Sequence, residues 1–248
     1  MNKNYPTVTI GCPVRDRELY LPSYLECIKN LDYPLENITL LFIENDSKDS
    51  TLSILNKFKN ENNHLFHRIK IYTYNQGTPP DERDSYIREQ FSYNALSRLR
   101  NYWLQQIKTS YALSCDSDIM MPKNTLKQLL SHKQDYVAGL IVNGYLFDKS
   151  NPYKYLNILK KVNGGYTHIN QYPENTLLEV DFSGAIMLLS QKSCKLGHFG
   201  FDKQGEDLVM CQTLQSKGIK IYVDTSIRCT HCMSEEYLEL YKKGEFVF

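Results

Sequence analysis

The sequence predicts an α/β fold with a mostly parallel central sheet. Two patterns lead to this prediction: strand-like and helix-like segments alternate over the first 75 residues, and a strand-like segment near the middle of the chain ends in two acids. Strands that alternate with helices usually lie parallel, with the helices on the faces of the sheet. A chain of 248 residues can bury a core of that kind within one domain.

The segments of the first half fit this fold class in order. Short apolar or alternating runs predict strands, and these runs are Thr7–Cys12, Ile38–Glu44, Ile69–Tyr74 and Ser110–Cys115. Helical spacing of apolar residues predicts helices at Leu19–Lys29, 45–60 and Phe91–Lys108. The polar residues 75–90, which include "GTPPDERD", predict a loop.

The second half continues with fewer regular segments. Helices are expected at Lys123–Lys133 and Glu206–Lys217, and strands at Tyr136–Val142, Val180–Leu189 and Lys220–Val223. Residues 144–179 are rich in Tyr, Asn and Gly and show no long period, so no regular element is predicted there. We expect one domain over residues 1–234, with halves at 1–122 and 123–234, followed by a helical tail at 235–248.

Composition excludes several classes of protein. The formal net charge is +1, which gives no general affinity for nucleic acid or for an anionic membrane. The longest apolar runs, such as "ITLLFI", are too short to span a bilayer, and the polar N-terminus lacks the apolar core of a signal peptide. We therefore expect a cytoplasmic protein.

The seven cysteines are scattered, and several lie in apolar segments. Such cysteines are typical of free, buried thiols in a reducing compartment. Cys229, His231 and Cys232 lie close in sequence, but no second Cys-x-x-Cys occurs to complete a structural zinc site.

The paired acids Asp116 and Asp118 end the strand-like segment Ser110–Cys115. Ligands of open parallel sheets bind at the carboxyl ends of the strands. Two carboxylates separated by one residue repel each other unless a cation lies near them, and Mg²⁺ or Mn²⁺ prefers oxygen ligands and substrate phosphates. The pair indicates a metal and diphosphate site, although a solvated loop explains most Asp-x-Asp sequences.

Several motifs together resemble the GT-A glycosyltransferases, especially family 2 and its relatives. These motifs are "PTVTIGCPVRDRE", "LLFIENDSKDSTLSIL", "LSRLRNYWLQQIKTSYALSCDSDIMMP" and "FSGAIMLLSQKSCKLGHFGFDKQGEDLVMCQTLQSKGIKIYVDTSIRCTH". They occur in family order over roughly residues 6–231, although Glu44 and Asn45 replace the usual pair of acids after the second strand. The resemblance implies a GT-A fold, with a nucleotide-sugar-binding half at 1–122 and an acceptor half at 123–234.

The resemblance also implies which residues bind a nucleotide-sugar donor. The candidates for contacts with the base, ribose, diphosphate and sugar are Pro13, Val14, Arg15, Glu44, Asn45, Arg100, Asp116, Ser117, Ser183 and Gly184. A UDP-sugar is favoured and a GDP-sugar is possible. An acidic turn that caps the following helix also accounts for the segment around Glu44, and a solvated helix position also accounts for Arg100.

Metal and catalytic roles follow from the same resemblance. Asp118 is expected to bind Mn²⁺ or Mg²⁺ directly, with Asp116 in contact with the ribose and the metal's surroundings, and His231 as a further ligand. Asp207 is expected to be the general base of an inverting transfer, with Glu206 beside it as an orienting group or the alternative base. Carboxylates at a helix N-terminus also stabilise the helix dipole, which is the plain explanation of that pair.

The acceptor stays open: a glycan, a lipid-linked sugar and a protein all fit. The tyrosines of the 144–179 segment could stack on a sugar or hold a peptide, and they are Tyr145, Tyr153, Tyr155, Tyr166 and Tyr172. A retaining transferase, a sugar nucleotidyltransferase and a non-catalytic carbohydrate-binding protein are the alternative functions.

Overall fold

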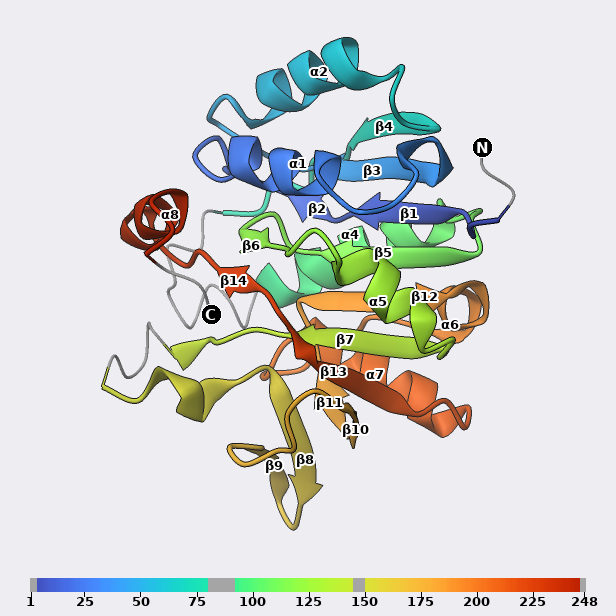
Figure 1. Cartoon of the computed structure of the whole chain (residues 1–248), viewed down its shortest axis with the longest axis vertical. Coiled ribbons are helices and arrows are strands. Elements are labelled where there is room, and N and C mark those ends of the chain that lie inside the picture. The colour runs from blue at the N-terminus through green and yellow to red at the C-terminus, as the bar shows by residue number, and fades with distance from the viewer. Residues whose placement is uncertain (1–3, 80–91, 145–149, 246–248) are drawn as a thin grey trace.

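A nine-stranded, mainly parallel sheet forms the centre of the protein in the computed structural model, which describes residues 4–79, 92–144 and 150–245 (Figure 1). Eight strands follow one another in the spatial order β10 (Leu177–Val180), β13 (Ile221–Arg228), β7 (Tyr136–Leu140), β12 (Ile186–Ser190), β5 (Tyr111–Cys115), β1 (Val8–Gly11), β3 (Ile38–Glu44) and β2 (Pro13–Val14). The ninth strand, β4 (Arg68–Thr73), also pairs with β3. Strand β12 runs antiparallel between β5 and β7, and β10 runs antiparallel to β13. The predicted fold class is confirmed.

Helices cover both faces of this sheet. One core cluster packs under α1 (Leu21–Lys29), α2 (Thr51–Asn62), α5 (Thr125–Ser131) and α8 (Glu235–Lys242). The other packs under α4 (Tyr93–Gln105) and α7 (Glu206–Ser216), with α6 (Gln191–Leu196) at its edge. Strand β3 shows why: Leu40 and Phe42 enter the first cluster, whereas Leu41 and Ile43 enter the second, so both faces of the strand are apolar.

The expected strand Val180–Leu189 is divided in the structure. β10 ends at Val180, β11 (Phe182–Ser183) joins a different sheet, and β12 begins at Ile186. A turn at Gly184 and Ala185 separates β11 from β12, and Ala185 has a φ of 70°, in the left-handed region. An apolar run indicates that its residues are buried, but it does not indicate where the chain turns. The turn at Gly184 and Ala185 could therefore not be predicted from the pattern.

The segment 144–179, for which no regular element was predicted, contains a β-hairpin. β8 (Ile158–Val162) pairs with β9 (Gly165–His168), and β11 completes a three-stranded sheet that projects from the main body (Figure 1). The prediction was wrong because "ILKKV" exposes most of its side chains and shows no alternation. A 3₁₀ turn, η4 (Pro152–Tyr155), precedes the hairpin, and Tyr145 lies outside the described residues.

Other boundaries differ modestly. β13 continues to Arg228, beyond the predicted end at Val223, through an irregular register. The helix α6, which was not predicted, begins after Ser190, whose hydroxyl accepts from the Ser193 N–H. A short ribbon of β6 (Ile119–Met120) and β14 (Thr230–His231) brings the end of β13 to the acid pair. In the part of the chain that the structure describes, no helix has the length and apolarity needed to cross a bilayer.

Candidate active site

The predicted site residues come from several elements that meet at the carboxyl edge of the sheet. β1 and β2, β3 and β5 end at this edge, and α7 begins there. Parallel strands place their carboxyl ends side by side, which is why residues distant in sequence converge. The loops after β2, β3 and β4 form one side of the site, and the acid pair with α7 forms the other.

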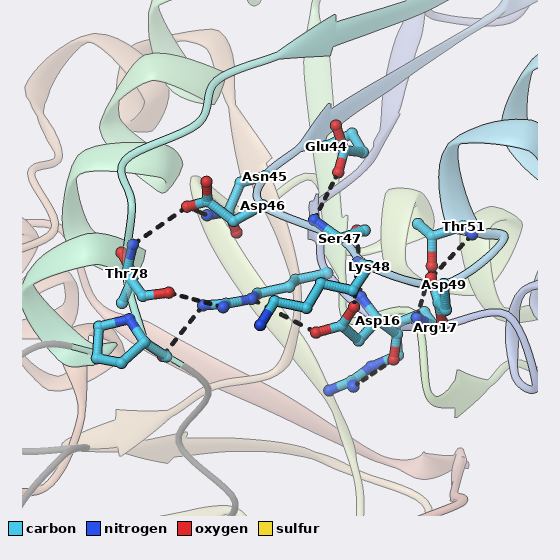
Figure 2. Close-up of polar contacts among 12 residues, drawn as sticks. Asp16, Arg17, Glu44, Asn45, Asp46, Ser47, Lys48, Asp49, Thr51 and Thr78 are labelled. Carbon is cyan, nitrogen blue, oxygen red and sulfur yellow. Dashed lines mark hydrogen bonds and ion pairs between the residues drawn. The ribbon is translucent and has the colours of Figure 1, made fainter.

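On the first side, Arg15 and Asp46 join three loops, and Figure 2 shows Asp46 bonded to Thr78. The Arg15 guanidinium donates to the carbonyl oxygens of Thr78 at 2.7 Å and Pro79 at 3.3 Å. The Asp46 carboxylate accepts from the backbone N–H groups of Gln76, Gly77 and Thr78 at 2.9 to 3.3 Å. Asp46 has a φ of 53°, a left-handed conformation that Asp tolerates better than most residues.

The predicted base-contact residues lie between these loops and the core. Glu44 is buried, and its Oε1 accepts from the Ser47 N–H at 3.0 Å, so it caps the turn that leads to α2. Asn45 is also buried and donates to Asp46 Oδ2 at 3.1 Å. Val14 packs in the core, which leaves its side chain little surface for a ligand, whereas Pro13 is half-buried. The structure shows the alternative capping role of Glu44, and its contact with the base of a donor stays a prediction.

Arg100 lies buried at the centre of the site. Its Nε is 2.7 Å from Glu206 Oε1, one terminal nitrogen is 2.8 Å from Asp116 Oδ1, and the other donates to Ser114 Oγ at 3.1 Å. Among the described residues, its guanidinium therefore has protein partners on every nitrogen. This geometry makes Arg100 a link between the acid pair and α7, and neither a solvated helix position nor an open donor-contact residue describes it. The adjacent Asn101 exchanges two hydrogen bonds with the Phe199 backbone.

Asp118 and His231 face each other across the β6–β14 ribbon. His231 Nε2 lies 3.7 Å from Asp118 Oδ1, and Arg17 approaches Asp118 Oδ2 at 3.6 Å. His231 Nδ1 lies 3.0 Å from Asn143 Oδ1, an oxygen that can only accept, so Nδ1 donates this hydrogen bond and Nε2 faces Asp118. Burial opposes ionisation of Asp118, but His231 and then Arg17 outweigh it and hold the pKa of this carboxyl well below its usual value.

These residues fit a divalent cation chemically. Asp118 offers an ionised carboxylate, His231 offers an oriented imidazole nitrogen, and Asn143 supplies the outer hydrogen bond that metal-binding histidines commonly have. Asp116 is held instead by Arg100. Within the described ranges, no three His, Cys, Asp or Glu side chains are grouped closely enough to form a complete ligand set by themselves. Catalytic Mg²⁺ and Mn²⁺ commonly take their remaining ligands from phosphates and water, so two protein ligands suffice.

Asp207 is fixed against the turn between β11 and β12. Its Oδ2 accepts from the Ala185 N–H at 3.0 Å, and a Cβ on Gly184 would lie only 2.4 Å from that oxygen. Its Oδ1 is buried and has no hydrogen-bond partner among the described residues, with Arg100 Nε 3.7 Å away. Burial raises the pKa of Asp207 to about 7, against the opposing charge of Arg100 and with support from Glu206. The arrangement leaves one carboxylate oxygen able to accept a proton near neutral pH.

Glu206 differs from Asp207 although the two are adjacent. Its side chain is 7% exposed and its Oε1 is occupied by Arg100. The structure therefore separates the two acids: Glu206 belongs to the Arg100 network, whereas Asp207 keeps a free oxygen.

Ser183 and Gly184 are held by Asn157, a residue that belongs to none of the predicted motifs. The Asn157 amide donates to Ser183 Oγ at 3.2 Å and Gly184 O at 3.0 Å, and also to Gly139 O. Ser183 is fully buried, which places its hydroxyl in this network and away from solvent, and Ser117 is also buried. Asn143, Asn157 and Arg17 were missed because single polar residues outside a motif carry no spacing signal.

Among the described residues, Cys229 and Cys232 form no group of three metal-binding side chains with His231. All seven cysteines are free, and burial raises the pKa of both Cys229 and Cys232 to about 12. A zinc ligand must be a thiolate, which this environment disfavours. His231 instead faces the carboxylate Asp118.

Comparison with known proteins gives the family. The Anp1 family pattern matches residues 1–186 of the 248. The chain belongs to the Anp1 family. A glycosyltransferase 25 family member of Anopheles gambiae is 24% identical to it over 152 residues, which cover 59% of this chain and 26% of that protein. The Anp1-family chain thus spans about a quarter of the length of this relative.

Two solved structures resemble this Anp1-family chain in fold. TarS of S. aureus, residues 1–349 in complex with UDP-GlcNAc, has a TM-score of 0.57 at 19% identity, with 90% of this chain and 58% of that chain covered. The mannosyltransferase PcManGT of Pyrobaculum calidifontis, in complex with GDP-Man and Mn²⁺, has a TM-score of 0.58 at 14% identity, covering 96% and 61%. The Anp1-family chain has the GT-A fold of these glycosyltransferases.

Proposed function

We propose that this protein transfers a sugar from a nucleotide-sugar donor to a hydroxyl group of an acceptor. Asp207 carries the proposal: its carboxylate is half-buried, its buried Oδ1 accepts no hydrogen bond from the described residues, and burial raises its pKa to about 7. It is joined through Arg100 to Asp116, the first residue of the acid pair. A proton acceptor next to a diphosphate-binding edge is the arrangement that glycosyl transfer to a hydroxyl requires.

The donor would lie across the carboxyl edge of the sheet. The loops joined by Arg15 and Asp46 would hold the nucleoside, and Glu44 would accept from the imino group of the base. That interaction suits uracil and guanine alike; the neighbouring structures contain UDP-GlcNAc and GDP-Man. We favour UDP and keep GDP as the alternative outcome of the test below.

Asp118 and His231 would hold a divalent cation, with Asn143 orienting the imidazole. A bound Mn²⁺ or Mg²⁺ supplies positive charge where negative charge grows on the departing phosphate. PcManGT and GalNAc-T7 were solved with Mn²⁺, which supports a metal in this fold. Arg17, 3.6 Å from Asp118, is a second cation at the same place.

In the transfer, the acceptor oxygen would form a bond to the anomeric carbon while the bond from that carbon to the phosphate oxygen breaks. The hydroxyl proton would pass to Asp207, and the electron pair of the broken bond would leave with the nucleoside diphosphate. Direct attack of this kind inverts the configuration. Glu206 and Arg100 would position Asp207 and Asp116 without accepting the proton.

The test is calorimetric titration with UDP and GDP, each with and without Mn²⁺, followed by mass spectrometry of products from a panel of nucleotide sugars. We expect Mn²⁺-dependent binding of one nucleotide, loss of that dependence in Asp118→Ala, and no change in Asp32→Ala, an exposed aspartate paired with Lys127. Mn²⁺-dependent affinity that survives Asp118→Ala would refute the ligand role of Asp118. Nucleotide binding with neither transfer nor donor hydrolysis would instead indicate a binding protein.

A further inference from the structure

A pocket of about 400 Å³ lies under the projecting hairpin, beside the reaction centre just described. This volume lies within the range of about 300 to 1,000 Å³ that is common for small-molecule sites. The residues that line it come from the end of β7, the hairpin and the loop before α7, and they are Asn143, Leu156, Asn157, Leu159, Tyr166, His168, Phe182, Gln204 and Leu208.

Chain connections place this pocket next to Asp207. Leu208 directly follows Asp207 on α7, and Phe182 is separated by one residue from Gly184, which contacts the Asp207 carboxylate. On another wall, Asn143 bonds His231. The pocket therefore adjoins both the predicted base and the predicted metal ligand.

The lining of the pocket differs in charge from the rest of the site. It contains no Asp, Glu, Lys or Arg among the described residues, whereas Arg17, Arg100 and the acid pair crowd the carboxyl edge of the sheet. A diphosphate, a carboxylate or a lysine side chain would be left without a countercharge in the pocket, which is costly for a desolvated ion. The lining thus favours a neutral ligand.

The side chains present suit one class of neutral ligand, a sugar ring. Tyr166, Phe182 and His168 offer flat rings, on which the C–H faces of a pyranose can pack, and Gln204 offers an amide for its hydroxyls. Carbohydrate rings combine apolar faces with a polar rim, and the pocket combines the same two features. A peptide would instead require backbone donors and acceptors at regular spacing along a groove.

Two of these groups are held in place before any ligand binds. His168 Nδ1 donates to Leu156 O at 2.7 Å, and its ring meets Tyr155 edge-on. Gln212 donates to the Tyr166 hydroxyl at 3.2 Å. Fixed side chains lose less conformational entropy on binding, so the pocket is partly preorganised.

We propose that this pocket holds the acceptor, and that the acceptor is a neutral saccharide ring whose free hydroxyl reaches Asp207. The proposal rests on the proposed function and selects one acceptor class from glycan, lipid-linked sugar and protein. The acceptor hydroxyl is the group that loses its proton to Asp207 and gains the bond to the donor sugar. Tyr166 and Gln204 are the residues that set acceptor affinity.

The test uses the full chain without donor. Saturation-transfer NMR would measure binding of methyl glycosides of glucose, galactose, mannose and N-acetylglucosamine, with neutral peptides containing Ser, Thr or Lys as the comparison. We expect at least one glycoside to bind, at least tenfold weaker binding in Tyr166→Ala and Gln204→Ala, and retention in Tyr166→Phe. Gln105→Ala, an exposed amide on α4, is the matched control.

A titration of the same variants with UDP and Mn²⁺ separates this proposal from the proposed function. Unchanged nucleotide affinity together with lost glycoside binding supports the pocket. Glycoside affinity that is equal in wild type and Tyr166→Ala overturns it, as does binding of the peptides and of no glycoside. A wild type that binds glycosides through Tyr166 but no nucleotide would keep the saccharide site and reject the transferase.

Discussion

Arg100 on α4 and Glu206 at the start of α7 form a buried ion pair, with Nε 2.7 Å from Oε1. Both side chains are less than a tenth exposed, and the same guanidinium reaches Asp116 at 2.8 Å. The pair therefore fastens the helix that carries the predicted base to the strand end that carries the acid pair. Removing one partner would leave a buried charge uncompensated.

We expect Arg100→Met to lower the free energy of unfolding by about 3 to 5 kcal/mol, because Glu206 and Asp116 would lose their shared countercharge. Urea unfolding followed by circular dichroism measures this change. Arg98→Met, two positions away on the same helix and exposed, should change stability by less than about 0.5 kcal/mol. The double variant Arg100→Met with Glu206→Gln should recover part of the loss, and equal losses for both arginines would contradict the prediction.

Asp207→Asn should stabilise the protein at pH 8 and remove transfer. The native pKa of Asp207, raised from 3.8 to about 7, means that the folded state binds more protons than the unfolded state between these pH values. The free energy of unfolding therefore falls as pH rises through that window, and Asn avoids this cost because it carries no titrating carboxyl. Thermal melting should show that the melting temperature of the variant rises relative to that of the wild type between pH 4 and pH 8.

The same group sets the pH dependence of turnover. Transfer needs the deprotonated carboxylate, so kcat should rise with pH and level off above about 7. Donor affinity in Asp207→Asn should match the wild type. A variant with near-normal kcat would remove Asp207 as the base.

Gly184→Ala should lower kcat by at least 100-fold with a smaller effect on donor affinity. The added Cβ would meet Asp207 Oδ2 at 2.4 Å, so the carboxylate would be displaced from its position. Ala185→Gly is the matched substitution, because it keeps the N–H that bonds Asp207 and relieves a φ of 70°. Turnover that is normal in Gly184→Ala would show that the turn does not position the base.

Asn143→Ala should weaken Mn²⁺ binding about 10- to 100-fold by releasing the His231 ring. Manganese electron paramagnetic resonance in the presence of UDP measures this affinity directly. Asn170→Ala, an exposed asparagine after the hairpin, serves as the control. If Asn143→Ala binds Mn²⁺ as the wild type does, orientation of His231 through Nδ1 has no part in the site.

Asp46→Ala should weaken nucleoside binding and destabilise the loop after β4. Backbone N–H groups of Gln76, Gly77 and Thr78 lower the pKa of Asp46 against the opposing effect of burial. A lowered native pKa contributes stability that is present above the unfolded value near 3.8 and is lost as pH falls. Hydrogen exchange at these three amides should rise in the variant at pH 7, and unchanged exchange would contradict the capping role.

The sequence determined the order of strands and helices along the chain and the edge at which the site lies. Strand and helix patterns differ in period, so the alternating segments predicted the parallel half of the sheet. Asp116 and Asp118 directly follow a buried strand-like run, so they marked the end of a strand. The motif order also selected Asp207 and His231. These predictions depend on local spacing, which a sequence records.

Only the tertiary structure decided which partner each charge has. Arg100 contacts Glu206, 106 residues away, and His231 contacts Asn143, 88 residues away, and no periodicity relates such pairs. The turn at Gly184 and the β8–β9 hairpin were concealed for the same reason, because their conformation is stabilised by Asn157 and by cross-strand pairing. The adjacent acids Glu206 and Asp207 differ in their surroundings, because Arg100 holds Glu206 Oε1 whereas burial raises the pKa of Asp207 to about 7. These effects act through space, whereas sequence spacing reports only distance along the chain.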